Sequence, residues 1–176
     1  WGVRSQSGTN SVSGSLFTSN SYGAYGVAGS LTIDHSTLVS NSYGVYSSGT
    51  SGAVGVTNSV LTGNTYGLYR SNTILIGNSN DDVWGNSSAN YSSTTAGTGN
   101  ITANPLYVGS GTTPYRLTSN SPARKSDSTG GDMGAFPYVS DPTPGLVGTL
   151  WLDTTINTSQ SVLGDLTVPP GVTVTI

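Results

Sequence analysis

Cysteine is absent from this chain of 176 residues, and charged side chains make up only 7% of it. Without cysteine, neither a disulfide framework nor a cysteine-based zinc site can form. Only five residues are Lys or Arg and the net charge is −3. The chain therefore lacks the cluster of basic residues that nucleic-acid binding requires. No apolar run approaches the roughly 18 residues of a transmembrane helix.

Glutamate, lysine and methionine, which favour helices, are equally scarce. The chain contains no glutamate, one lysine (Lys125) and one methionine (Met133), so a helical repeat is a poor fit. Glycine, serine, threonine and asparagine dominate instead, a composition that by itself would suit a disordered linker. A regular apolar pattern in the first 84 residues argues against disorder there.

That pattern is an internal repeat. The glycine of a recurring Asn-Ser-Tyr-Gly motif is spaced by 21 or 23 residues, and a short motif at such a period is typical of a solenoid. The four copies are SLFTSNSYGAY (15–25), STLVSNSYGVY (36–46), SVLTGNTYGLY (59–69) and TILIGNSNDDVW (73–84).

Aligning the copies produces apolar rows that alternate with Ser, Thr or Tyr, which is the pattern of a strand with one buried face. A turn of this length has a perimeter of about 70 Å, which suits three short strands joined by corners. The sequence therefore predicts an all-β fold, a right-handed parallel β-helix. The predicted rows are Phe17, Leu38, Leu61 and Leu75; Val3, Ala24, Val45, Leu68 and Val83; and Val12, Ile33 and Val56.

Two further rows lie at the predicted corners. The repeated glycines, Gly2, Gly23, Gly44 and Gly67, are expected to supply positive φ angles. The asparagines are expected to form a structural ladder, with a ligand site built from their amides as the alternative. The ladder members are Asn20, Asn41, Asn64 and Asn78; the last step spans only 14 residues, and its path is left open.

After Trp84 the pattern changes. Residues 86–100 form a polar stretch without periodicity, interpreted as a loop. Three pieces then follow in order: NITANPLYV (100–108), YRLTSNSPA (115–123) and GDMGAF (131–136). This ordered set resembles the closing segment of bacterial surface β-helix proteins of the choice-of-anchor kind. The chain departs from that family's pattern where Arg124, Lys125 and Ser126 follow the Ser-Pro-Ala element.

The domain prediction follows from these changes. It consists of β-helix coils over 1–84, a loop and closing segment over 85–138, a Pro-rich linker over 139–148, and the start of a further β-rich module over 149–176. The resemblance implies a large exported cell-surface protein, of which this chain is expected to be a part.

Candidate catalytic or metal-binding groups are few. Asp34 has no second carboxylate in its predicted row, and His35 is interpreted as a corner hydrogen-bonding residue rather than a general base. Asp81 and Asp82 are the only adjacent carboxylates, interpreted as a solvated turn with a calcium ligand set as the alternative. The cluster of Arg124, Lys125, Asp127 and Asp132 is interpreted as surface ion pairs. No catalytic residue, metal or cofactor is predicted.

The aromatic residues are the more informative surface. Tyr25, Tyr46, Tyr69 and Trp84 are predicted to form one outward row beside an inward row, as a candidate contact surface. The alternative is a ladder that only stabilises the stacked strands. A second aromatic row is predicted beside the corner glycines, formed by Trp1, Tyr22, Tyr43 and Tyr66.

These observations favour a non-catalytic structural or adhesive module of an extracellular, cell-surface or fibre protein. Its expected partners are neighbouring modules of the same chain or identical copies packed end to end, with carbohydrate as a further candidate. The alternative is a carbohydrate-binding or polysaccharide-degrading β-helix, whose catalytic Asp, Lys and Arg would have to converge on one sheet face.

Overall fold

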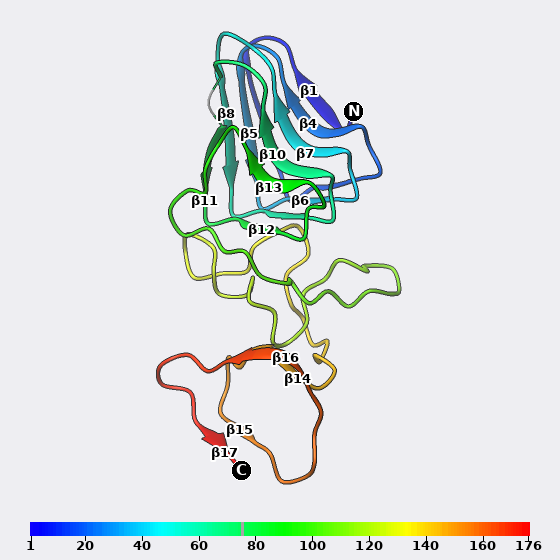
Figure 1. Ribbon diagram of the computed structural model, residues 1–176, viewed down its shortest axis with the longest axis vertical. Coiled ribbons are helices and arrows are strands. Elements are labelled where there is room, and N and C mark those ends of the chain that lie inside the picture. Colours follow the sequence, from blue (N-terminus) through cyan, green and yellow to red (C-terminus); the bar gives the residue numbers. More distant parts are fainter. Residues whose placement is uncertain (75) are drawn as a thin grey trace.

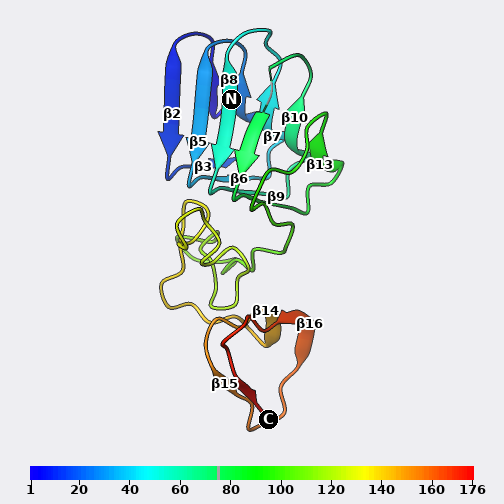
Figure 2. The ribbon, with the colours of Figure 1, turned by 90° about the vertical axis from the view of Figure 1, so that its left-hand side faces the viewer.

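The computed structural model describes residues 1–74 and 76–176, and this part of the chain is all-β. Successive strands wind into a solenoid whose three sides are parallel sheets, so the predicted parallel β-helix is confirmed (Figure 1). Below the solenoid lies a segment with little regular structure, and below that a C-terminal coil region with the strands β14 to β17 (Figure 2). A search of the described residues for a helix able to cross a membrane finds none.

The first sheet, sheet A, has five strands in the order β1-β4-β7-β10-β13. Each strand lies one coil after its neighbour and pairs with it in parallel, which brings chemically alike side chains into contact. Its strands are β1 (Val3–Ser5), β4 (Tyr22–Gly26), β7 (Tyr43–Ser47), β10 (Tyr66–Arg70) and β13 (Ala89–Ser92).

The other two sides are four-stranded sheets. Sheet B has the order β11-β8-β5-β2 and contains β2 (Thr9–Ser13), β5 (Ser30–Asp34), β8 (Ala53–Thr57) and β11 (Ile76–Ser79). Sheet C has the order β12-β9-β6-β3 and contains β3 (Leu16–Thr18), β6 (Thr37–Val39), β9 (Val60–Thr62) and β12 (Asp82–Trp84).

The hydrophobic core is a column inside these three sheets. Alternate residues of each strand point inward, and those of the middle coils, such as Ile33, Leu38 and Leu61, are completely buried. In-register pairing stacks Phe17 on Leu38 and Leu38 on Leu61, as the repeat predicts. Because each coil buries its apolar residues against the next, the core is continuous along the axis.

The last coil departs from the predicted register. Strand β11 pairs with β8 and β12 pairs with β9, so Asn78 lies opposite Val56 and Trp84 opposite Thr62. Val83 therefore occupies the row of Leu61, whereas Leu75 lies outside the described residues. The prediction placed this copy on the wrong sides because a short apolar run between asparagines fits either of two corners.

The stretch 86–100 is likewise not a simple loop. Residues 89–92 form β13 and extend sheet A by one strand, with Tyr66 opposite Ala89 and Leu68 opposite Tyr91. The solenoid thus continues beyond Trp84, which the polar composition of this stretch concealed.

The repeated glycines have a different role from the one predicted. None of Gly2, Gly23, Gly44 and Gly67 has a positive φ; those angles occur at the residues just before the ladder asparagines, Ser19, Ser40, Gly63 and Gly85. At Gly44 an added Cβ would lie 2.7 Å from the carbonyl oxygen of Gly67. Glycine is required here because the coils approach too closely for a side chain.

The closing segment covers the outer side of sheet C. Its buried residues Leu117 and Ala123, both from YRLTSNSPA, and Met133 of GDMGAF pack together against Val60 of β9. The partly buried Ile101 and Tyr107 of NITANPLYV pack against this cluster. As a result β6 and β9 are buried on both faces. All three pieces therefore contribute to one cap over sheet C.

The C-terminal coil resumes parallel pairing. Strand β14 (Leu146–Thr149) pairs with β16 (Val162–Thr167), and β15 (Thr154–Thr155) with β17 (Val174–Thr175). Leu146 and Leu150 of this region are buried, but several of its apolar side chains are exposed, in contrast to the solenoid core: Leu152, Val162, Leu163, Val168 and Ile176.

Candidate functional site

The asparagine row forms a hydrogen-bonded ladder along one corner. Oδ1 of Asn41 accepts hydrogen bonds from the backbone N–H of Asn20 at 3.0 Å and from its Nδ2 at 3.3 Å. Asn64 does the same for Asn41, and Asn86 does the same for Asn64. Asn86, 22 residues after Asn64, thus occupies the place predicted for Asn78, whose amide instead accepts from Gly97 and Asn100.

A second ladder, which was not predicted from the sequence, runs along the corner between sheets B and C. The Oγ of Ser36 accepts from the N–H of Ser15 at 3.2 Å, and the Oγ of Ser59 accepts from the N–H of Ser36 at 3.1 Å. Asp81 takes the next place, with Oδ1 2.9 Å from the N–H of Ser59, and Asn100 follows it. The same spacing that revealed the asparagines could have revealed this row.

Asp81 and Asp82 are therefore not on a solvated turn, as predicted, but fully buried. Each has one oxygen with a backbone partner, from Ser59 and Ala103 respectively, and a buried Oδ2 without a hydrogen-bond partner. Burial raises the pKa of Asp81 to about 7 and that of Asp82 to about 8, where the charge of Asp81 adds to the effect. Among the described residues, no group of three or more His or Asp side chains is placed so that it could hold a metal ion.

His35 lies between two carboxylates. Its Nδ1 is 2.9 Å from Oδ2 of Asp34, and its Nε2 is 3.0 Å from Oδ2 of Asp127, a residue of the closing segment. Because an ionised carboxylate only accepts hydrogen bonds, both ring nitrogens must carry protons for both contacts to form. The arrangement is an imidazolium bridge, in which His35 has no free nitrogen to act as a base.

The pKa values agree with this bridge. Although burial acts to lower it, the hydrogen bonds to Asp34 and Asp127 raise the pKa of His35. Burial acts to raise the pKa of both carboxyls, but hydrogen bonds from His35 and from neighbouring groups outweigh it, so both are lowered. The Asp127 side chain is only 5% exposed, whereas those of His35 and Asp34 are about one-third exposed.

The bridge is one part of a latch between the closing segment and the solenoid. Asn58, which donates to Asp34, also accepts through Oδ1 from the N–H of Ser128. The carbonyl oxygen of Asn58 accepts from the N–H of Gly134, and Oγ1 of Thr37 accepts from the N–H of Ala135. The contact between His35 and Asp127 could not be predicted from the sequence, because the two residues are 92 positions apart.

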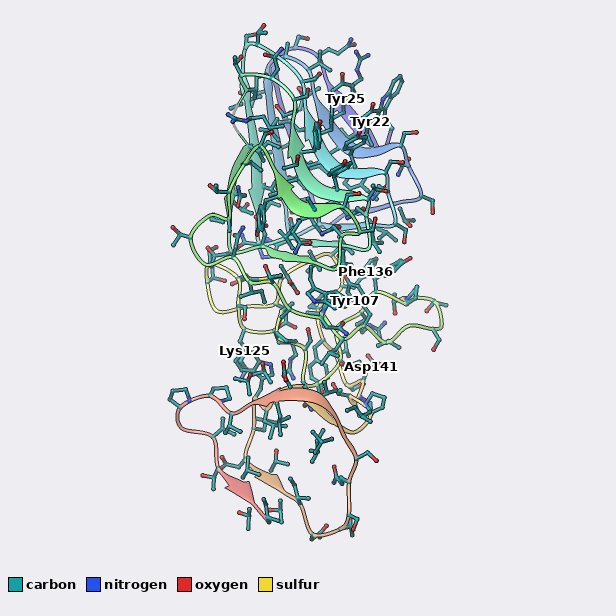
Figure 3. The ribbon with its side chains drawn as sticks, in the orientation of Figure 1. Tyr22, Tyr25, Tyr107, Lys125, Phe136 and Asp141 are labelled. Atoms are coloured by element: carbon teal, nitrogen blue, oxygen red, sulfur yellow. The ribbon has the colours of Figure 1, made fainter. Side chains whose placement is uncertain are left out.

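The charges of the closing segment do not pair with one another as predicted. The Arg124 guanidinium lies 3.9 Å from the centre of the Tyr138 ring, and Lys125 lies over Trp151. Asp132 accepts from the backbone N–H groups of Lys125 and Tyr138. These residues fix the turns of the segment and its contact with the C-terminal coil (Figure 3).

The outer side of sheet A carries the largest aromatic cluster, which we name the tyrosine face. Tyr22 and Tyr25 of β4 mark one end of it in Figure 3. Arg4 lies against the Tyr25 ring at this end, and Trp84 is not part of the face because it belongs to sheet C. The face consists of Tyr22, Tyr25, Tyr43, Tyr46, Tyr66 and Tyr69.

Most rings of the face pack against other rings. In the row beside the glycines, Tyr43 stacks on Tyr22 and on Tyr66 with centroids 5.2 Å apart in both pairs. Rings of the two rows meet at about the same separation within each strand, as for Tyr43 and Tyr46 at 5.0 Å. The face therefore presents ring edges and hydroxyl groups to solvent more than whole ring surfaces.

Comparison with protein-family models, curated proteins and solved structures finds no match for this chain. The resemblance to choice-of-anchor surface proteins thus stays a prediction, whereas the parallel β-solenoid rests on the strand pairing itself.

Proposed function

We propose that this chain is a structural, adhesive module of an extracellular surface or fibre protein. The observation that carries the proposal is the tyrosine face, a partly exposed aromatic surface that runs along three successive coils of a rigid scaffold. Contiguous exposed aromatic surface on a soluble domain commonly marks an interaction site.

The placement of the acidic and basic groups supports a scaffold rather than a catalyst. Asp34 and Asp127 are both hydrogen-bonded to His35 in the latch, and Asp81 is bound into the serine ladder. The first three groups hold the closing segment on the solenoid, and Asp81 accepts a backbone hydrogen bond within the stack. The low overall charge also favours close packing with neighbouring modules or copies, because little repulsion opposes it.

The test is adhesion of the purified protein to insoluble polysaccharides and to hydrophobic and hydrophilic beads. A double variant, Tyr43→Ser with Tyr46→Ser, should bind much less, so that most of the protein that the parent retains on the surface is no longer retained. The double Phe variant keeps the ring stack and separates hydroxyl contacts from packing. Thr32→Ala, on the exposed outer side of β5, is the matched control and should bind as the parent does.

Two results would count against the proposal. One is adhesion that is the same for the parent and for a folded double Ser variant. The other is release of unsaturated sugars from pectin or alginate that disappears on Asp34→Ala, because this outcome would assign a catalytic role to the latch.

A further inference from the structure

A hollow of about 490 Å³ lies where the end of the solenoid and the closing segment meet the C-terminal coil. We name it the Trp84 hollow. One wall comes from Trp84 at the end of β12 and from the stretch around Asn104, and the other comes from β14 and β16. Its volume falls within the range of about 300–1,000 Å³ that is typical of small-molecule sites.

The hollow offers an aromatic and an aliphatic surface. The Trp84 side chain points away from the solenoid core, since its neighbour Val83 is the inward residue of β12, and it is 36% exposed. Leu163 of β16 is 61% exposed. Such exposed apolar groups in a concave place gain most from contact with the apolar side of a ligand.

Uncommitted polar groups lie beside these apolar surfaces. The Oδ1 of Asn104 accepts from the N–H of Leu106 at 3.0 Å, and this bond leaves its Nδ2 for another acceptor. Asp165, Thr102 and Thr167 are exposed and line the same hollow. Asp165 is the one charged residue among the lining residues that the structure describes, so the hollow carries a negative charge without a cation to offset it.

We propose that the Trp84 hollow binds a short neutral oligosaccharide. A sugar ring has one face of C–H groups, which pack on an indole, and a rim of hydroxyls, which require both donors and acceptors. The hollow supplies the indole of Trp84, the Asp165 carboxylate as acceptor and the Asn104 amide as donor. The lone carboxylate disfavours uronic acids and sulfated sugars, which would bring a second negative charge.

This site is independent of the tyrosine face, which lies on a different sheet. The experiment is isothermal titration calorimetry of the whole chain with neutral tetrasaccharides of glucose, xylose and mannose, and with a tetragalacturonate for comparison. At least one neutral ligand should bind, and the uronate should bind more weakly. Trp84→Ala should reduce the affinity about tenfold and Asp165→Asn about threefold.

Control variants distinguish binding in the Trp84 hollow from nonspecific binding to other exposed apolar or aromatic side chains. Leu152→Ala removes an exposed apolar side chain of the C-terminal region, outside the hollow, and should bind as the parent does. The double Phe variant of Tyr43 and Tyr46 should also bind normally, so failure of the adhesive proposal and failure of this one are distinguishable.

Asp165→Asn guards against a folding artefact, because it alters only an exposed side chain. The proposal is overturned if no neutral tetrasaccharide binds, if the uronate binds best, or if neither Trp84→Ala nor Asp165→Asn changes the affinity.

Discussion

Replacing Asp81 by Asn should stabilise the protein at neutral and alkaline pH. At its place in the ladder Asp81 accepts from the N–H of Ser59, whereas the serines of the same row also donate to the carbonyl two residues back. Serine can do both, as Ser59 does by donating to the carbonyl of Thr57. A carboxyl group can do both only when it is protonated, and its Oδ2 is the buried atom that has no partner.

The pKa gives the size of the effect. A rise from 3.8 to about 7 corresponds to about 4 kcal/mol, at about 1.4 kcal/mol per unit of pKa. Well below the unfolded pKa of 3.8 the carboxyl is protonated in both states and the penalty is absent, and at pH 4 the penalty is still small. As pH rises from there, the unfolded chain releases its proton while the folded chain retains it, so the free energy of unfolding falls until the pH reaches the folded pKa near 7.

The asparagine variant removes this dependence without removing the acceptor. Its amide nitrogen can bond to the carbonyl two residues back, as Asn20 and Asn41 do. We expect Asp81→Asn to unfold with a free energy about 2–4 kcal/mol higher than the parent at pH 8, and nearly equal at pH 4.

Urea unfolding at pH 4, 6 and 8 measures both quantities, and the pH 4 pair serves as the internal control. A parent that is more stable than the variant at pH 8, or a difference that does not change with pH, would refute the reasoning.

Three further changes test other parts of the structure. His35→Asn keeps a residue that tolerates the positive φ of this position, as Asn58 does in the same row. It should lower the free energy of unfolding in urea by about 1 kcal/mol. This loss should occur only at pH values below the raised pKa of His35 and should be absent once the imidazole is neutral. Asn64→Ala leaves the buried N–H of Asn41 without its acceptor and should lower the free energy of unfolding by about 3 kcal/mol. Asn20→Ala, in an end coil, should lower it by less. Equal losses for the two variants would contradict the ladder. Gly44→Ala should lower the thermal midpoint because its Cβ meets the next coil, whereas at Gly55, where the nearest atom is 4.0 Å away, alanine should be tolerated; the reverse order would contradict the close-approach argument.

The candidate site was only partly accessible to sequence reasoning. The period placed Tyr25, Tyr46 and Tyr69 in one row, because identical offsets in a solenoid become direct neighbours. Trp84 was misplaced, because the last copy of the motif matches two different corners when only its apolar residues are aligned. Its position in a hollow depends on Asp165 and Leu163, which no periodicity relates to it.

The sequence by itself determined the solenoid, its parallel strands and the residues of its core, since a repeating period carries both the strand pattern and the register between coils. Only the tertiary structure decided that Asp81 and Asp82 are buried and that His35 bridges Asp34 and Asp127. The physical reason is that these contacts join the periodic solenoid to a segment without a period, and burial and pairing across that boundary depend on how the chain folds back.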